Sequence, residues 1–298
     1  MALDGVVIVN KEEGLSSQAV VNRVKRIFGV TKAGHTGTLD PMATGVLPVL
    51  IGRGVKASEF MLSSDKHYIA TLRLGLTTDT EDIWGTVLTT SDTLPTEGEV
   101  MAAISRFVGE IMQTPPMYSA LKVGGKKLCD LAREGKTIDR QARKITVYSI
   151  VTERLSDNEY RLDIHCSKGT YIRTLCKDIG ESLGVGGVMS SLCRGKSAGF
   201  FLSDAKTLSA LEAMSEEERL GTVYPVEHIF KDWTRVDLPQ FFERLALSGQ
   251  EIYLHKIGAT LPLGYRVALY GSDGFFAIGE VRQYEGGLAI KPIRQFKV

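Results

Sequence analysis

One loop of this sequence carries a single carboxylate in a setting that suits chemistry. Residues 34–45 read Gly-His-Thr-Gly-Thr-Leu-Asp-Pro-Met-Ala-Thr-Gly, and Asp40 is their only acid. Glycines permit positive φ and close approach of another chain, and Pro41 keeps the backbone of Asp40 out of the α region. The segment therefore predicts a shaped loop. Loops on a rigid scaffold often carry catalytic side chains, although an ordinary Asp-Pro turn is the alternative.

Two other segments carry candidate side chains. Residues 66–75 alternate, so that Tyr68 shares one face of a predicted strand with Ala70, Leu72 and Leu74. Residues 166–175 read Cys-Ser-Lys-Gly-Thr-Tyr-Ile-Arg-Thr-Leu and lead into a predicted helix that carries Arg173 near its start. A tyrosine or an arginine in such a place is usually structural, so these residues gain meaning only together with Asp40.

The elements that must position these residues alternate between strands and helices. Ser16 is expected to cap one helix, and Thr96 with Glu99 forms a capping box for another. The expected strands are 5–9, 46–51, 65–75, 144–155, 159–166 and 188–192, and the expected helices include 126–133 and 171–183. After about residue 232 the pattern changes to short strands at 267–270, 275–281 and 288–290, separated by glycine-rich turns. This part predicts a small barrel-like unit.

Composition sets limits on the class of protein. The 298 residues are 43% hydrophobic and 24% charged, which is typical of a soluble globular chain. No apolar run approaches the roughly 20 residues of a membrane span, and the first residues lack the features of a signal peptide. The four cysteines form no C-x-x-C pair, so we expect reduced thiols in a cytoplasmic protein, with no zinc site.

Charge is unevenly distributed although the net charge is only +1. Residues 119–144 hold eight basic and three acidic side chains, whereas residues 204–232 hold three basic and seven acidic ones. A basic patch on a neutral chain fits a nucleic-acid surface, and a solvated helix face is the alternative.

Taken together, these segments resemble the TruB family of tRNA pseudouridine synthases. The resemblance rests on residues 34–45, on Lys-x-Tyr-x-x-x-x-Arg-Leu-Gly at 66–75 and on Ser-Lys-Gly-Thr-Tyr-Ile-Arg at 167–173. It covers about residues 4–200. It implies an α+β fold with a mixed, largely antiparallel central sheet flanked by helices. The implied domains are a catalytic domain over 1–232 and a PUA-like RNA-binding barrel over 233–298, the latter resting on size and position.

The resemblance implies isomerisation of uridine 55 in the T loop of tRNA. The N-glycosidic bond must break, the uracil must turn, and a C5–C1′ bond must form, which requires the nucleotide to be flipped out of its stack. Asp40 matches the catalytic aspartate and is expected to act as nucleophile. Attack at C1′, attack at C6 and assistance to proton removal all stay open.

Two further residues match catalytic positions of the family. Arg173 matches the arginine that pairs with the aspartate, a role that suits a bidentate guanidinium better than a lysine. Tyr68 matches the tyrosine that stacks on the flipped uracil, where stacking is worth about 1–3 kcal/mol.

The remaining positions are expected to bind the substrate. Tyr171 and Leu192 would wall the uracil pocket, and Asp82 would hold a charged partner or the RNA backbone. His35 is assigned to the RNA, with a structural hydrogen bond as the alternative. The basic side chains expected to contact phosphates are Lys11, Lys56, Lys122 and those of residues 126–144.

Two other functions deserve comparison. One is an RNA-guided relative that works within a ribonucleoprotein, but the sequence lacks a basic N-terminal extension and a lysine-rich tail, which favours a stand-alone monomer without an obligate protein partner. The other is a non-catalytic RNA binder, against which the joint presence of Asp40, Tyr68 and Arg173 argues. A tRNA-folding role in addition to catalysis is compatible with both the motifs and the need to open the T arm. The reaction is redox-neutral, so no metal or organic cofactor is expected.

Overall fold

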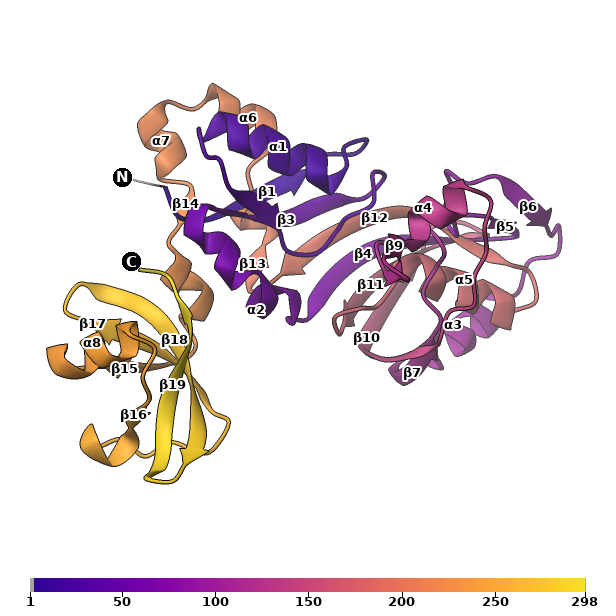
Figure 1. Cartoon of the computed structure of the whole chain (residues 1–298). Coiled ribbons are helices and arrows are strands. Elements are labelled where there is room, and N and C mark those ends of the chain that lie inside the picture. The colour runs from indigo at the N-terminus through magenta and orange to yellow at the C-terminus, as the bar shows by residue number, and fades with distance from the viewer. Residues whose placement is uncertain (1–2, 298) are drawn as a thin grey trace.

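The structure, a computed structural model, describes residues 3–297, so Met1, Ala2 and Val298 at the ends of the two expected domains lie outside the described residues. The fold is α+β, with one large sheet, a second sheet near the C-terminus and helices around both, as the sequence predicts (Figure 1). No helix among the described residues is long and apolar enough to cross a membrane.

The large sheet has ten strands. They are β1 (Gly5–Lys11), β2 (Ala33–His35), β3 (Thr44–Ile51), β4 (Lys66–Leu74), β7 (Gly109–Gln113), β10 (Arg143–Arg154), β11 (Glu159–Cys166), β12 (Gly187–Ser197), β13 (Phe200–Phe201) and β14 (Val223–Tyr224). Their order is β14-β1-β3-β12-β4-β11-β10-β7, with β2 beside β3 and β13 beside β12. The described pairs are antiparallel except β3 with β12, where Cys193 faces Thr44 and Arg194 faces Gly45. This parallel contact joins the two halves of the sheet.

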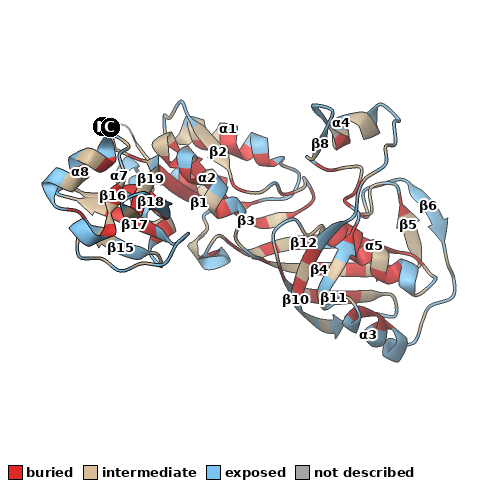
Figure 2. Ribbon diagram, turned by 60° about the horizontal axis from the view of Figure 1, so that its bottom comes forward, coloured by how far each residue is buried: buried red, intermediate tan, exposed pale blue. Residues whose placement is uncertain are grey.

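Helices α1, α3, α5 and α6 contribute to the main core on one face of this sheet, whereas α2 packs Met61 against Val6 and Ile8 on the other face. The α-helices of the larger part are α1 (Ser17–Ile27), α2 (Ser58–Leu62), α3 (Glu97–Ser105), α4 (Leu128–Arg133), α5 (Ile172–Ser182), α6 (Leu208–Ala213) and α7 (Glu216–Leu220). The main core contains Val20 and Val24 of α1, Ile104 of α3 and Leu175 of α5, all packed on strand side chains. Buried residues accordingly follow the strands and the inner faces of these helices (Figure 2). Burial of these apolar faces supplies the main stabilising free energy of the layer.

The helix starts follow the predicted capping. Ser16 Oγ accepts a hydrogen bond from the backbone of Ala19, and Thr96 with Glu99 forms the reciprocal box at α3. Short 3₁₀ helices complete the chain: η1 (Gly52–Ala57), η2 (Leu202–Asp204), η3 (Val226–Phe230) and η4 (Leu254–Lys256).

The basic segment differs from the prediction at its start. Lys126 and Lys127 do not begin a helix but form β9 (Lys126–Lys127), which pairs with β8 (Lys122–Val123). Gly124 and Gly125 between them both have positive φ, 57° and 84°, which is the geometry of a tight hairpin turn. The helix begins only at Leu128, and the whole segment projects from the body of the sheet (Figure 2). A longer hairpin pairs β5 (Leu76–Thr78) with β6 (Val87–Thr90).

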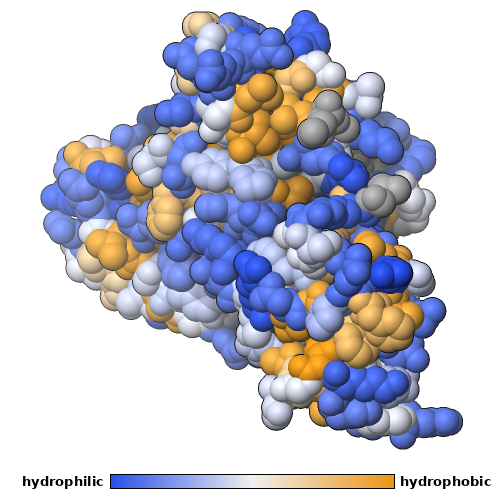
Figure 3. Space-filling model, turned by 90° about the vertical axis from the view of Figure 1, so that its left-hand side faces the viewer, coloured by the Kyte–Doolittle hydropathy of each residue, from blue (hydrophilic) through white to orange (hydrophobic). Residues whose placement is uncertain are grey.

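The C-terminal part forms a separate sheet around its own core. Its strands are β15 (Thr234–Asp237), β16 (Ile252–Tyr253), β17 (Arg266–Gly271), β18 (Gly274–Tyr284) and β19 (Gly287–Gln295), in the order β15-β17-β18-β19-β16. Helix α8 (Gln240–Leu247) packs Ala246 into this core. The three longer strands lie where the sequence predicts them, whereas β15 and β16 are too short to leave a pattern. Seen from the side of this sheet, the surface is mainly hydrophilic with scattered apolar patches (Figure 3).

An aromatic cluster joins the two parts. Phe60 of α2 meets Phe230 and Trp233 edge-on, with ring centroids 5.6 and 5.8 Å apart, and Phe230 also packs against Phe275 and Phe296 of the second sheet. The ion pair Arg294–Glu59, at 2.5 Å, lies beside the same junction. The two sheets are therefore held together by apolar packing as well as by charge.

We expect Phe230→Ala to lower the free energy of unfolding by about 3–5 kcal/mol and to uncouple the two sheets, because it removes a ring that is 1% exposed and contacts both. Denaturant unfolding followed by tryptophan fluorescence measures this, since Trp233 reports on the junction. The matched control is Phe241→Ala, which removes a ring that is 65% exposed. Equal loss in both variants would contradict the assigned role.

Candidate functional site

Two side chains from β1 and α1 hold the loop that carries Asp40. Ser17 Oγ donates to Leu39 O at 3.0 Å and accepts from Leu39 N at 2.8 Å. The Lys11 ammonium donates to Pro41 O at 3.0 Å and to Ala43 O at 2.5 Å. These contacts fix the backbone on both sides of Asp40.

A buried arginine on β12 also holds this loop through hydrogen bonds. Arg194 is 1% exposed and donates from Nη2 to Gly37 O at 3.1 Å and from Nε to Val46 O at 2.8 Å. Gly45 lies directly against it, since a Cβ there would be 2.4 Å from Arg194 O, and its φ is 101°. Only glycine fits a backbone with both constraints. The loop therefore crosses the junction of β3 and β12 in a single conformation.

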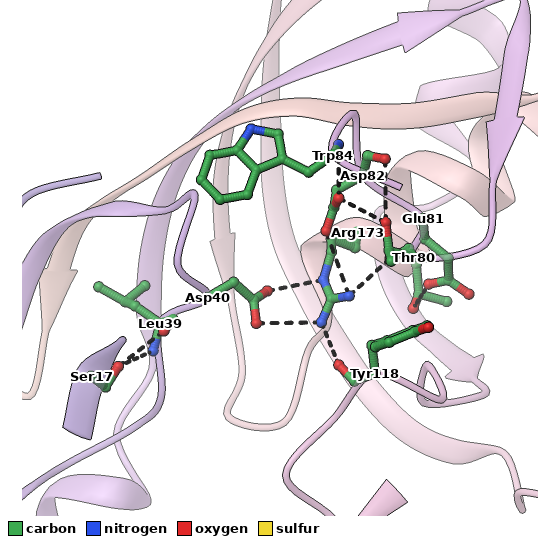
Figure 4. Close-up of polar contacts among 10 residues, drawn as sticks. Ser17, Leu39, Asp40, Thr80, Glu81, Asp82, Trp84, Tyr118 and Arg173 are labelled. Carbon is green, nitrogen blue, oxygen red and sulfur yellow. Dashed lines mark hydrogen bonds and ion pairs between the residues drawn. The ribbon is translucent and has the colours of Figure 1, made fainter. Parts of the chain in front are cut away.

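Asp40 pairs with Arg173 at the start of α5. Arg173 Nε lies 2.9 Å from Asp40 Oδ2, and Nη2 donates to Asp40 Oδ1 at 3.4 Å (Figure 4). The Arg173 side chain is 6% exposed and the Asp40 side chain 35% exposed. The carboxylate thus keeps one side open while the guanidinium holds it in place by its planar fork.

Three more acceptors surround Arg173. Nη1 donates to Thr80 O at 2.8 Å, Nη2 donates to Tyr118 O at 2.6 Å, and Asp82 Oδ2 lies 3.7 Å from Nη1. A buried guanidinium needs such partners because its desolvation is costly. These contacts hold the Arg173 guanidinium in one orientation, and its ion pair with Asp40 then orients the Asp40 carboxylate.

The turn that supplies Thr80 and Asp82 is itself anchored to α5. Glu81 has a positive φ of 63°, unusual for a residue with a side chain, and its carboxylate accepts from Thr174 Oγ1 at 2.6 Å. Asp82 Oδ1 accepts from Thr80 Oγ1 at 2.8 Å and from the backbone of Trp84 at 3.1 Å. Burial raises the pKa of both carboxyl groups, and the Arg173 charge opposes this rise.

Tyr68, Tyr171 and Leu192, the residues expected to face the uracil, lie on β4, at the N-cap of α5 and on β12. Tyr68 on β4 faces Arg194 across the sheet, and burial raises the pKa of its hydroxyl while the Arg194 charge lowers it. The pKa of the Tyr171 hydroxyl is also raised by burial. The Asp40 charge also contributes to the raised pKa of both hydroxyls. Leu192, 8% exposed, belongs to the core that Tyr68 packs against.

Lys11 is not placed to contact phosphate, contrary to expectation. Its side chain is 0% exposed, and its ammonium is turned onto the Asp40 loop. The sequence could not separate a lysine that binds RNA from one that binds loop carbonyls, because both would follow the same strand.

The other expected RNA contacts lie away from the pair. Lys56 is exposed and donates to Gln295 O at 3.0 Å, which puts it at the junction of the two sheets. Lys122 is exposed on the β8–β9 hairpin. His35 ends β2, half-buried, and burial followed by the Arg194 charge lowers the pKa of its imidazole. Its Nδ1 is buried without a hydrogen-bond partner among the described residues.

Sequence reasoning missed several residues that build this site. Arg194 and Ser17 hold the Asp40 loop through Gly37 O and Leu39 O. The carbonyl of Thr80 accepts from Arg173, and Glu81 accepts from Thr174. None carries a local signal, because the partners are distant in sequence. Among residues 3–297, no three His, Cys, Asp or Glu side chains are grouped to hold a metal ion.

The buried Lys11 ammonium predicts a pH-dependent contribution to stability. Burial lowers its pKa from 10.5 to about 8. At a pH between about 8 and 10.5, the Lys11 side chain is still protonated in the unfolded chain but has lost its proton in the folded protein. The free energy of unfolding of the wild type should therefore rise with pH relative to that of Lys11→Met. The difference should change by about 3 kcal/mol. Urea unfolding of both proteins at neutral pH and at about pH 10.5 measures it, and other titrating groups such as Lys66 cancel. A difference that does not vary with pH would refute this assignment.

Known proteins share both the sequence and the fold. Residues 25–172 match the model of the TruB family pseudouridylate synthase (N terminal domain), and residues 173–231 match that of the tRNA pseudouridylate synthase B C-terminal domain. The chain is 44% identical over 292 residues to "tRNA pseudouridine synthase B" of Burkholderia pseudomallei (strain 668), covering 97% of this chain and 96% of that protein. It is 42% identical to the protein of the same name from Alkaliphilus oremlandii (strain OhILAs), covering 94% of each.

The fold is also found in solved structures. A chain of "Crystal Structure of a Cbf5-Nop10-Gar1 Complex" superposes with a TM-score of 0.76 at 26% identity, over 98% of this chain and 84% of that one. The family models match in succession across Asp40, Tyr68 and Arg173, and two relatives match over nearly the whole length. The chain therefore belongs to the TruB family of pseudouridylate synthases.

Proposed function

We propose that this protein isomerises uridine 55 in the T loop of tRNA to pseudouridine. The observation that carries the proposal is the Asp40 carboxylate, held by the buried Arg173 and open on one side. Relatives that match 97% and 94% of the chain are named tRNA pseudouridine synthase B, which favours tRNA over an RNA-guided target. We further propose that it acts as a cytoplasmic monomer without an obligate protein partner. A separate tRNA-folding role stays a prediction.

The reaction needs one carboxylate and a water-poor pocket. Breaking the N1–C1′ bond develops positive charge at C1′, which a carboxylate stabilises or captures, as in glycosidases. The uracil then turns so that C5 bonds to C1′, C5 loses its proton, and N1 gains one, leaving an isomer. Asp40 is the proposed nucleophile. Attack at C1′ and attack at C6 both fit an open carboxylate edge.

The neighbouring side chains have distinct proposed roles. Tyr68 stacks on the flipped uracil, and its hydroxyl, whose pKa burial raises, is a neutral hydrogen-bond donor. Tyr171 and Leu192 wall the pocket. Asp82 acts on Arg173 at 3.7 Å rather than on RNA.

The RNA surface lies beyond this pocket. Lys122, Lys126, Arg133 and Lys136 of the projecting segment are exposed, as expected of groups that neutralise phosphates. His35 is proposed to order the T loop by hydrogen bonding, since burial lowers the pKa of its imidazole and so favours the neutral form. Recognition then depends on the shape of the arm and on unstacked loop bases.

The direct test uses an unmodified T-arm stem–loop that carries tritium at uracil C5. We expect the wild type to release tritium and Asp40→Asn to lose at least about 1,000-fold in rate while it still binds the RNA in a gel shift, because the amide keeps the shape but lacks the charge. Lys122→Ala is the matched contrast, expected to weaken binding with little change in rate at saturation. Tight binding without release by the wild type would point to an RNA binder or to another target uridine.

A further inference from the structure

An exposed tryptophan lies next to the site. Trp84 is 56% exposed, although tryptophan is among the most buried residue types on average. Its backbone N–H donates to Asp82 Oδ1 at 3.1 Å, and the other oxygen of Asp82 lies 3.7 Å from Arg173. In Figure 4 the indole extends from this turn toward the side on which Asp40 lies. The ring is thus attached to the same network that holds the catalytic carboxylate.

The turn that presents the indole is rigid. Ile83 N donates to Met189 O at 3.0 Å, and Gly85 N donates to Asp82 O at 3.2 Å. A Cβ on Gly85 would lie 2.3 Å from Thr80 Oγ1 and 2.6 Å from Asp79 Oδ1, so any larger residue would displace these side chains. An aromatic ring on a fixed turn loses little conformational entropy when it binds a ligand, which suits a preformed contact surface.

The carboxylates of this turn are engaged within the protein. Asp82 is 7% exposed, Glu81 accepts from Thr174 Oγ1, and Asp79 Oδ1 accepts from Thr86 N at 2.7 Å. What the turn offers to a ligand beside the site is therefore mainly the indole face. A flat π-face in contact with RNA favours an unpaired base, whatever its identity.

We propose that Trp84 stacks on an unpaired base of the substrate RNA that neighbours the flipped uridine. The proposal rests on the proposed function, since it assumes that RNA lies over this site. It assigns Trp84 a part distinct from that of Tyr68, which faces the uracil inside the pocket. Trp84 holds a neighbouring base outside the pocket, after the loop has lost its own stacking, and so contributes to binding rather than to chemistry.

Binding of the T-arm stem–loop to three variants of the full chain gives the first test. We expect Trp84→Ala to raise the dissociation constant roughly tenfold, about 1.4 kcal/mol, and Trp84→Phe to lose much less. The control is Leu88→Ala, which removes an apolar side chain that is 63% exposed on the same hairpin and should change nothing. Melting temperatures should stay equal, because Trp84 is exposed. Unchanged binding of Trp84→Ala would overturn the proposal.

Fluorescence gives a second, independent readout. The chain has two tryptophans, so Trp233→Phe, which keeps an aromatic ring at the junction, leaves Trp84 as the sole emitter. We expect the stem–loop to quench its emission and shield it from acrylamide. Tritium release by the same protein reports separately on the proposed function. Release without quenching or shielding would reject the stacking role and leave the synthase activity standing.

Discussion

A guanidinium that is only 6% exposed has to find acceptors for its N–H groups within the protein, and the site follows from how Arg173 does so. Its acceptors come from three separate segments: the carbonyls of Thr80 and Tyr118 and the carboxylate of Asp40. Each segment is thereby drawn to the first turn of α5. Asp40 keeps an edge open, at 35% exposure. The same contact that satisfies the arginine thus presents the carboxylate.

The position of this pair depends on how the two halves of the sheet meet. Strands β3 and β12 run parallel over a short contact, where Gly45 faces Arg194. At this point the chain has left the Asp40 loop, and the buried Arg194 ties the loop back to the sheet through Gly37 and Val46. The parallel contact pairs Thr44 and Gly45 with Cys193 and Arg194, and the Asp40 loop leads directly into it. Asp40, the proposed nucleophile, therefore lies on a loop that is tied to the sheet by hydrogen bonds at Gly37 and Val46.

Some features of the structure could be predicted from local sequence patterns and from the family motif. The helix caps at Ser16 and Thr96, the long strands, and the pairing of Asp40 with Arg173 all follow from spacing or from the family motif, and the structure has them. The sequence could not predict Lys11, whose expected phosphate contact is replaced by buried loop carbonyls. Nor could it predict Arg194, because a buried arginine is recognised only by distant carbonyls. The β8–β9 hairpin was not predicted, because its strands are only two residues long and contain mainly lysine.

The measurement that tests the central claim most directly is the single-turnover rate of Arg173→Lys with saturating stem–loop, together with its dissociation constant. Lysine keeps the charge but cannot donate in a planar fork to Asp40 while also reaching Thr80 O and Tyr118 O. If the fork sets the orientation of Asp40, the rate falls roughly 100-fold and RNA binding is unchanged. A rate close to that of the wild type would show that charge alone suffices and would contradict this account of the site.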